Sequence, residues 1–329
     1  MSSQAVLIAG GYGVVGRRIA TDLASDYPDR VVITGRNPER ANATAAAIGH
    51  GVRGRLHAAI ERGLRYTDIT PHLTELGREA AYEQLHAAAR ASGSRVLLGA
   101  GLVPGISNMI VTALVGTLGA ADTIETALLL SAGDVSGPAS FDYFLQELAM
   151  RFDVHVDGAD RPAHAFSDPR VVAFPAPVGP RRAYLFPFSD QVLYPRTLHA
   201  RTALTRLALD PAWLARVLAL LVRTGAAQVV ARERIRRAIA SARRDRRAPP
   251  AAPFALRLDV THGERSSHAT LVGHMQADAT AAGAAALVRA LLDGEVAEPG
   301  AWMPEQVIDP RGFFSRLARR GLHVEFPHT

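Results

Sequence analysis

A glycine-rich turn near the start of the chain limits the fold more than any other feature. The apolar run 4–9 predicts a strand that is covered on both faces, and GGYGVVG follows it directly. Gly11, Gly13 and Gly16 satisfy the pattern G-x-G-x-x-G, and a predicted helix over 14–25 comes next. A strand, this turn and a helix, in that order, are typical of a dinucleotide-binding Rossmann domain.

Each glycine of the turn has its own mechanical role. Gly11 permits the tight turn, Gly13 lets the backbone approach a pyrophosphate, and Gly16 lets the helix pack closely on the strand. The N-terminus of the helix then faces the negative charge of the phosphates. We therefore predict cofactor contacts along the whole turn: Gly11, Tyr12, Gly13, Val14, Val15 and Gly16.

The residues after the second predicted strand, 30–34, indicate which dinucleotide binds. An NAD-selective site normally has an acidic residue here, which binds the ribose hydroxyls. This chain instead has Gly35, Arg36 and Asn37, with Arg40 one turn later. Because a guanidinium can stack on adenine and bind a 2′-phosphate, the sequence predicts NADP(H) rather than NAD(H). The alternative is a solvated arginine at the start of a helix.

Composition excludes several classes of chemistry. All 37 residues counted as Lys+Arg are arginine, and the chain has no cysteine. This excludes Schiff-base and P-loop lysines, the Tyr-x-x-x-Lys relay of short-chain dehydrogenases, thiol nucleophiles and zinc–thiolate sites. The 12 histidines show no H-x-x-x-H or H-E-x-x-H spacing, so we predict no metal site. We expect a reducing cytoplasm, without a signal peptide or a membrane span.

Four further segments indicate a family. They are TGRNPERA (34–41), GLRYTDIT (63–70), SRVLLGAGLVPGISN (94–108) and GAWMPEQVIDP (300–310). Together with the glycine turn they resemble the saccharopine dehydrogenase-like oxidoreductases. The resemblance implies an NADP-binding Rossmann domain, an inserted α+β domain with substrate and dimer surfaces, and a C-terminal segment that returns to the first domain. It also implies hydride transfer at a carbon–nitrogen bond, typically of an imine formed from an amino acid or a polyamine.

The predicted fold class is α/β, with a Rossmann-type parallel sheet domain and an α+β second domain. After a helix predicted near 107–118, short strands alternate with turns, and strands predicted at 254–260 and 268–275 form a hairpin around Gly263. Helices predicted over 211–223, 226–243 and 279–293 cover one side, which is typical of an α+β domain. We expect the NADP-binding domain at 1–118, the substrate and dimerisation domain at 119–299, and the returning segment at 300–329.

One stretch departs from the resemblance. A predicted helix over 38–48 is followed by GHGVRGR, and another predicted helix begins at Leu56. Members of the family normally have about thirty residues more near 49–55, with a third strand, a helix and a fourth strand that lies beside the first. An omitted mobile segment, a truncated gene, or a strand at 66–70 that takes the vacated place would each explain this. With a real gap, adenine could still bind while the nicotinamide is poorly positioned.

Candidate catalytic residues lie at the end of the predicted strand at 66–70. Ligands of open α/β sheets bind at the carboxyl ends of such strands, which is where Tyr66 and Asp68 lie. Asp68 could orient an amine or stabilise an iminium, and His72 could donate a proton near neutral pH. The alternatives are a turn-capping Asp68 and an exposed His72. Gly101, in GLVPG, is a further predicted cofactor contact.

Weaker candidates lie in the second domain. Asp134 follows a predicted strand, and Arg196 and Arg201 could clamp a carboxylate. The arginine-rich run 232–247 could bind an anionic partner, including nucleic acid, but a solvated helix that leads into a linker is the favoured interpretation. Trp213 and the apolar pattern of 211–222 indicate core or dimer contact.

These observations predict an NADP(H)-dependent oxidoreductase that acts on a small-molecule imine or amine derived from an amino acid or a polyamine. We expect a cytoplasmic homodimer, without a nucleic-acid or membrane partner. One alternative is a non-catalytic NADP-binding sensor or partner protein. Another is an enzyme, such as an epimerase, that transfers hydride only transiently.

Overall fold

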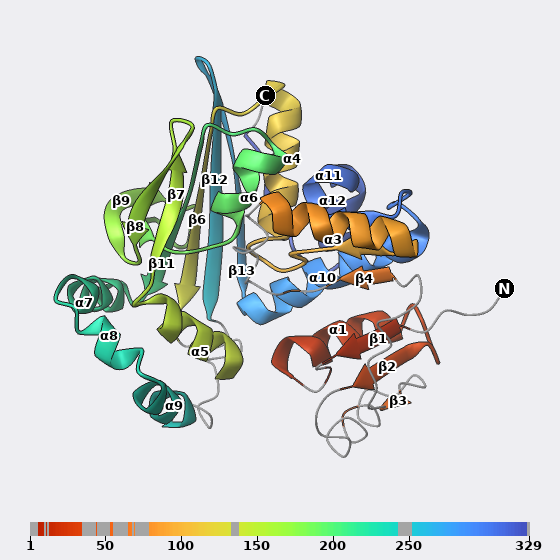
Figure 1. Cartoon of the computed structure of the whole chain (residues 1–329), viewed down its shortest axis with the longest axis horizontal. Helices are drawn as coiled ribbons and strands as arrows, with labels where there is room; N and C mark the ends of the chain where they lie inside the picture. Colours follow the sequence, from red (N-terminus) through yellow and green to blue (C-terminus); the bar gives the residue numbers. More distant parts are fainter. Residues whose placement is uncertain are drawn as a thin grey trace.

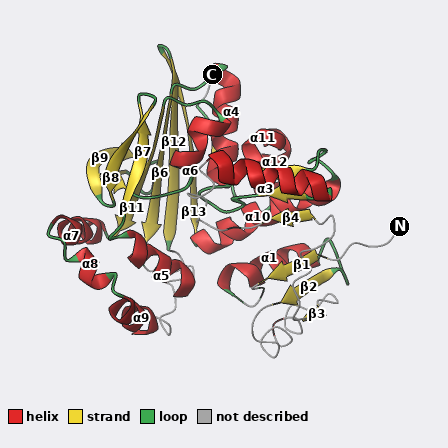
Figure 2. Ribbon diagram, viewed as in Figure 1, coloured by secondary structure: helices red, strands yellow, loops and turns green. Residues whose placement is uncertain are grey.

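The computed structural model describes residues 6–9, 11, 13–34, 44, 53–54, 65–67, 69, 79–132, 138–242 and 252–327. Their strands form two small parallel sheets and one large mixed sheet, with helices packed around them (Figures 1 and 2). The predicted fold class is confirmed, because a parallel α/β part, an α+β part and a returning C-terminal strand are all present.

The N-terminal parallel sheet contains β1 (Val6–Ala9), β2 (Val31–Thr34) and β3 (Arg53–Gly54), with β2 in the centre. Helix α1 (Val14–Ala24) connects β1 to β2. Its apolar residues recur at helical spacing and turn one face to the core: Ile19, Ala20, Leu23 and Ala24. β3, of two residues, pairs in parallel with β2 within the short connection noted in the sequence, and most of that connection lies outside the described residues.

A second parallel sheet contains β4 (Arg65–Thr67), β5 (Arg95–Leu97) and β14 (Gly300–Trp302), with β5 in the centre. Helix α3 (Glu79–Ser92) packs against β14 and β5. Although β14 and β5 are some two hundred residues apart in the chain, they pair in register. The C-terminal segment therefore returns to the first part of the chain, as the resemblance implied.

Helices, rather than a strand pair, connect these two small sheets. Among the described strands β1 pairs with β2 alone and β4 with β5 alone, so β4 does not take a fourth strand's place beside β1. Helix α10 (Gln276–Asp293) packs along α1 and also contacts β4 and β5 (Figure 1). Within the described residues, the parallel strands thus form two separate sheets, which α1 and α10 connect.

The large sheet has nine strands in the described part of the chain, and its centre is the parallel pair β6 (Thr123–Ser131) and β11 (Thr202–Asp210). The β12–β13 hairpin adds to β6 in antiparallel fashion, and it turns at Gly263 as predicted. The other strands are β7 (Arg151–Val156), β8 (Ala159–His164), β9 (Ser167–Ala173), β10 (Pro180–Leu185), β12 (Pro253–His262), β13 (Arg265–His274) and β15 (Val324–Glu325).

Helix α4 (Ile106–Leu118) lies against β12 and β13, and most of its side chains are buried. The helix predicted over 226–243 is divided into α8 (Ala227–Val230) and α9 (Glu233–Ala242). The remaining helices are α5 (Pro138–Glu147), α6 (Asp190–Thr197), α7 (Ala212–Arg223), α11 (Pro304–Val307) and α12 (Pro310–Ala318). Over the described ranges, none of the helices has the length and apolarity needed to cross a membrane.

Two of the segments that carried the resemblance meet in the interior. Asn108 Nδ2, in the first turn of α4, donates to Glu305 Oε2 over 2.9 Å. Thr197 Oγ1 donates to Glu305 Oε1 over 2.8 Å, while Gly105 N–H donates to Asn108 Oδ1 over 2.9 Å. Burial raises the pKa of Glu305. These residues therefore connect α4, α6 and α11, and their role is in packing.

Candidate functional site

The turn between β1 and α1 leaves no room for a side chain at Gly11. A Cβ atom there would lie 2.6 Å from Ile33 Cγ2 and 3.0 Å from the carbonyl oxygen of Ile8. The Gly11 N–H donates to that same carbonyl over 3.2 Å. The chain thus turns tightly against β2, which is what a phosphate-binding turn requires of its first glycine.

The N-terminus of α1 has no cap of its own. Gly13 occupies the N-cap position without a side-chain hydrogen bond, and the first turn contains no acidic residue. The Arg17 N–H donates to the carbonyl oxygen of Gly13 over 3.0 Å, so the amides of the first turn precede the helical ladder. This end of α1 therefore has both the free donors and the dipole needed to bind a phosphate.

An open cleft of about 1000 Å³ begins at this end of α1. One wall is α1 itself, and the opposite wall is built from the end of β13, the first turns of α10 and the loop after α12. The residues that line it are Gly13, Val14, Arg17, Arg18, Thr21, Asp22, Val272, Gly273, His274, Asp278, Ala279, Ala281, Ala282, Arg320, Gly321 and Leu322.

Arginine supplies the positive charge of the cleft. Arg18 pairs with Asp278, and Arg320 pairs with Asp22 across the two walls. Arg17 is exposed and forms no ion pair with the described residues. Among the described residues of the cleft, Arg17 is therefore an arginine without an ion pair, close to the N-terminus of α1 and available to an anionic ligand.

His274 is a site residue that sequence reasoning missed. It is the last residue of β13, it pairs in register with Pro253, and its exposed side chain lines the cleft. A Cβ atom at the preceding Gly273 would lie 2.5 Å from Phe254 Cε1, so the backbone here is packed closely on β12. An imidazole at the end of a rigid strand can serve as a proton donor. Only the predicted strand end pointed to this residue.

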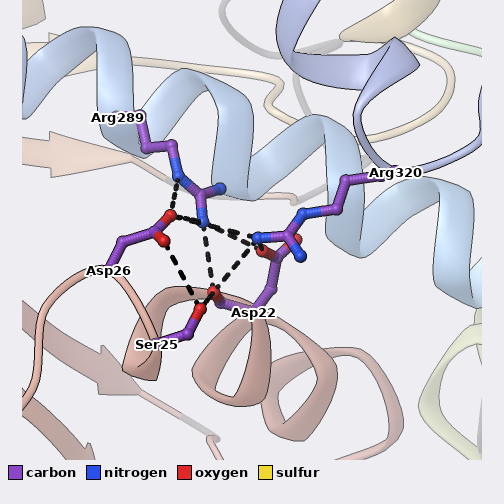
Figure 3. Close-up of polar contacts among 5 residues, drawn as sticks. All are labelled: Asp22, Ser25, Asp26, Arg289 and Arg320. Carbon is purple, nitrogen blue, oxygen red and sulfur yellow. Dashed lines mark hydrogen bonds and ion pairs between the residues drawn. The ribbon is translucent and has the colours of Figure 1, made fainter.

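A cluster of charges fixes α1 to the opposite wall (Figure 3). Arg289, on α10, donates from Nε to Asp26 over 2.8 Å and from Nη2 to Asp22 over 2.9 Å. Arg320 also contacts Asp22, and Ser25 Oγ donates to the carbonyl oxygen of Asp22 over 3.2 Å. Burial alone would raise the pKa of Asp26, but its hydrogen bond to Arg289 and the charge of that guanidinium lower it. We call Asp22, Asp26, Arg289 and Arg320 the charged clamp.

The structure separates some of the predicted site residues and leaves others undescribed. Gly11, Gly13, Val14, Val15 and Gly16 come together at the turn, and Gly13 and Val14 line the cleft. The other residues predicted for the cofactor and for catalysis include several outside the described residues: Tyr12, Gly35, Arg36, Asn37, Arg40, Asp68 and His72, as well as Asp134.

Four predicted residues lie away from the cleft. Tyr66 is exposed on β4, and Gly101 is buried beneath α10, where its carbonyl oxygen would lie 3.1 Å from a Cβ atom at Gly283. Arg196 lies in the last turn of α6, and Arg201 directly precedes β11. None of the four is among the residues that line the cleft in the described structure. No cluster of three or more His, Cys, Asp or Glu residues suited to a metal ion occurs in the described part of the chain.

Comparison with solved structures identifies the fold. Apo saccharopine dehydrogenase (L-Glu forming) from Saccharomyces cerevisiae superposes with a TM-score of 0.64, over 99% of this chain and 100% of the other, at 14% sequence identity. The chain has the fold of saccharopine dehydrogenase. The family resemblance drawn from the motifs is thus confirmed at the level of the fold.

Two further solved structures resemble this chain less than saccharopine dehydrogenase does. Diaminopimelate dehydrogenase of Corynebacterium glutamicum, in complex with diaminopimelate, gives a TM-score of 0.41 at 14% identity over 95% of this chain and 96% of the other. An engineered D-amino acid dehydrogenase bound to NADP⁺ gives 0.42 at 14% identity over 97% and 99%. Both scores are too low to support an argument. In sequence, neither family models nor curated proteins match the chain.

Proposed function

We propose that this chain is an NADP(H)-dependent oxidoreductase that transfers hydride at a carbon–nitrogen bond of a small substrate derived from an amino acid or a polyamine. The observation that carries the proposal is the uncapped N-terminus of α1, which opens into a cleft of about 1000 Å³ beneath the glycine turn. The saccharopine dehydrogenase fold supports it. As part of the same proposal, the enzyme is a cytoplasmic homodimer that does not bind nucleic acid.

Each group has a distinct task in the proposed reaction. The amides of the first turn of α1 bind the pyrophosphate, and Gly11 and Gly13 let the backbone approach it. Arg36 and Arg40, which lie outside the described residues, bind the 2′-phosphate. When bound, the nicotinamide supplies or accepts the hydride.

The substrate needs a proton donor and an anion site. His274 is placed to hold the proton that the substrate nitrogen gains or loses, because its imidazole lines the cleft. Arg17 is placed to bind a substrate carboxylate in the same cleft. The sequence predictions remain part of the proposal: Asp68 orients the amine, His72 is an alternative proton donor, Tyr66 is a further catalytic candidate, and Gly101 is a cofactor contact.

Cofactor titration tests the dinucleotide. NADPH should bind more tightly than NADH, and Arg36→Ala should weaken NADPH by roughly tenfold to a hundredfold, since one charge-assisted contact contributes about 1.5–3 kcal/mol. The affinity for NADH should change little. Arg151→Ala is the matched control, because Arg151 is an exposed arginine on β7. Equal affinity for the two cofactors would contradict the assignment to NADP(H).

A non-catalytic NADP-binding sensor is the second candidate, and the divided sheet favours it. In the described structure no strand joins β1 to β4, although in a doubly wound sheet the strands around this position support the reactive end of a dinucleotide. A sensor would bind NADPH and not oxidise it. Incubation with mixtures of amino acids and aldehydes or oxo acids, monitored by NADPH absorbance, distinguishes the two, because only an enzyme consumes NADPH.

A further inference from the structure

Three consecutive helices beside the large sheet carry exposed apolar side chains. Helix α7 packs on β11 and β10, and α8 and α9 follow it and contact each other in turn (Figure 1). On α7, Trp213 and Leu220 are each 60% exposed and Val217 is exposed as well. Val229 on α8 and Ile235 on α9 continue the series. We call these five residues the apolar edge. Of the two roles predicted for Trp213, its exposure excludes the core, and dimer contact stays a prediction.

Helix α7 packs against the large sheet through residues that are not part of the apolar edge. Helix α7 contacts β11 and β10 and buries Ala215 and Leu218 on that side. Trp213, Val217 and Leu220 follow one another at intervals of four and three residues, which places them on a single helix face. That face points outward, so α7 has a second apolar stripe that the fold itself leaves uncovered.

Arginine borders the apolar edge. Arg216 and Arg223 are exposed, lie three residues after Trp213 and Leu220 respectively, and form no ion pair within the described chain. Arg232 and Arg234 are exposed beside Ile235. Over 212–242 the sequence has six arginines and one glutamate. Exposed arginines therefore accompany the apolar residues on α7 and near the start of α9, which is the pattern of a helix that lies in a membrane interface.

We propose that the apolar edge binds the surface of a bilayer that contains anionic phospholipids. Trp213 and Leu220 would enter the boundary between headgroups and acyl chains, where tryptophan is enriched. The arginine side chains would extend from the stripe to the phosphates, with their aliphatic stems on the apolar side. The proposal departs from the expectation, drawn from the sequence, that the chain has no membrane partner.

Two other binding partners, a second copy of the chain and single-stranded nucleic acid, fit the apolar edge less well than a membrane does. A second copy of the chain related by a two-fold axis would bring the same arginine-rich surface against itself, which is unfavourable. Single-stranded nucleic acid is bound by several aromatic side chains that stack with bases, whereas the apolar edge has one aromatic residue. The proposal is independent of the cofactor, so either can fail without the other.

Tryptophan fluorescence of the full chain provides a direct test. The chain has two tryptophans, and Trp302→Phe leaves Trp213 as the single reporter. Vesicles of phosphatidylcholine and phosphatidylserine should shift its emission to the blue, and brominated lipid should quench it. Vesicles of phosphatidylcholine alone should bind much less, and added salt should weaken binding to the mixed vesicles. An unchanged emission with the mixed vesicles would overturn the proposal.

Variants locate the binding surface by vesicle sedimentation. Arg216→Gln combined with Arg223→Gln should lower the partition coefficient about 25-fold, because each arginine near an anionic surface contributes about fivefold. Leu220→Ser should lower it about tenfold or more. Val171→Ser is the matched control, because Val171 is an apolar residue on β9 that is 70% exposed. Equal effects of Leu220→Ser and Val171→Ser would contradict the proposal.

Two further outcomes would also overturn it. In analytical ultracentrifugation, loss of a dimer in Leu220→Ser alone would show that the edge is an interface between copies. Quenching of Trp213 by a single-stranded oligonucleotide, relieved by the double arginine variant, would assign the edge to nucleic acid. We expect vesicle binding. We also expect that Leu220→Ser keeps the mass of the parent protein and that the oligonucleotide leaves Trp213 fluorescence unchanged.

Discussion

Arg289→Met should release the N-terminal βαβ unit from the rest of the molecule. Arg289 donates to Asp26 over 2.8 Å and to Asp22 over 2.9 Å, and its side chain is only 12% exposed. Methionine keeps much of the aliphatic packing and removes the charge. Because β1 pairs with β2 alone in the described structure, contacts of α1 with α10 form much of the attachment of this unit.

The stability that Arg289→Met is expected to lose lies between the values for breaking a buried ion pair and an exposed one. Breaking a buried pair costs about 3–5 kcal/mol, whereas an exposed pair contributes about 0–1 kcal/mol. Asp22 is 13% exposed but keeps its contact with Arg320, and Asp26 is 47% exposed and can be rehydrated. We therefore expect a loss of about 2–3 kcal/mol, well below the upper limit for a buried pair.

Native-state hydrogen exchange can measure where this loss appears. Amides of α1 and β2 should exchange about 30- to 150-fold faster in Arg289→Met, which corresponds to about 2–3 kcal/mol. Amides of β12, in the large sheet, should exchange at the rate of the parent protein. Arg311→Met is the control, because Arg311 is exposed on α12. Equal acceleration in α1 and β12 would refute the reasoning, since the unit would then open only with the whole molecule.

Three further predictions concern single residues. Gly11→Ala should cost about 1–3 kcal/mol of stability by overpacking and should weaken NADPH binding, because its Cβ would lie 2.6 Å from Ile33 Cγ2; thermal melts and cofactor titration measure both effects. Burial raises the pKa of Asp190 to about 7, so its favourable contribution to stability is complete below about pH 4 and is lost as the pH rises to 7. In denaturant titrations Asp190→Asn should therefore remove about 4 kcal/mol of that pH dependence, and an unchanged pH profile would contradict the assignment. His274→Asn should lower kcat/KM about a hundredfold or more and alter the pH–rate profile while cofactor affinity stays within about twofold, and a loss of affinity alone would assign His274 a binding role instead.

Local signals predicted the parts of the fold that local chemistry determines. The turn at Gly11 and the hairpin at Gly263 were readable because each needs glycine at a fixed offset from an apolar run. β11 was not predicted, because Thr205 and Arg206 interrupt its apolar pattern. Arg206 is nevertheless buried, and its Nη1 donates to Glu125 over 3.0 Å. A pairing between residues so far apart in the chain leaves no periodic signal in the sequence.

The candidate site was only partly predictable for a similar reason. The sequence predicts the glycine turn, where we propose that the phosphates bind, because a single local segment forms it. The opposite wall of the cleft comes from β13, α10 and the loop at 320–322, and only the folded chain brings these to α1. His274 has no sequence motif, and Glu305 is a charged residue in a resembling segment that proves to be a packing residue beside Asn108. A motif can thus show ancestry without showing which of its residues act in chemistry.

Among the described strands, none pairs the N-terminal sheet with the second parallel sheet. The alignment of α1 with the opposite wall of the cleft therefore depends on the charged clamp. In the proposed function, binding of phosphate requires only the β1–α1 turn, which lies within one unit. The proposed hydride transfer also requires the wall that carries His274, and α1 meets that wall through Arg289, Arg320 and the Arg18–Asp278 pair. Because misplacement by about 1 Å can cost about a hundredfold in rate, Arg289→Met should lower kcat far more than it lowers NADPH affinity. If rate and affinity fall by the same factor, the clamp serves cofactor binding and does not align the two walls.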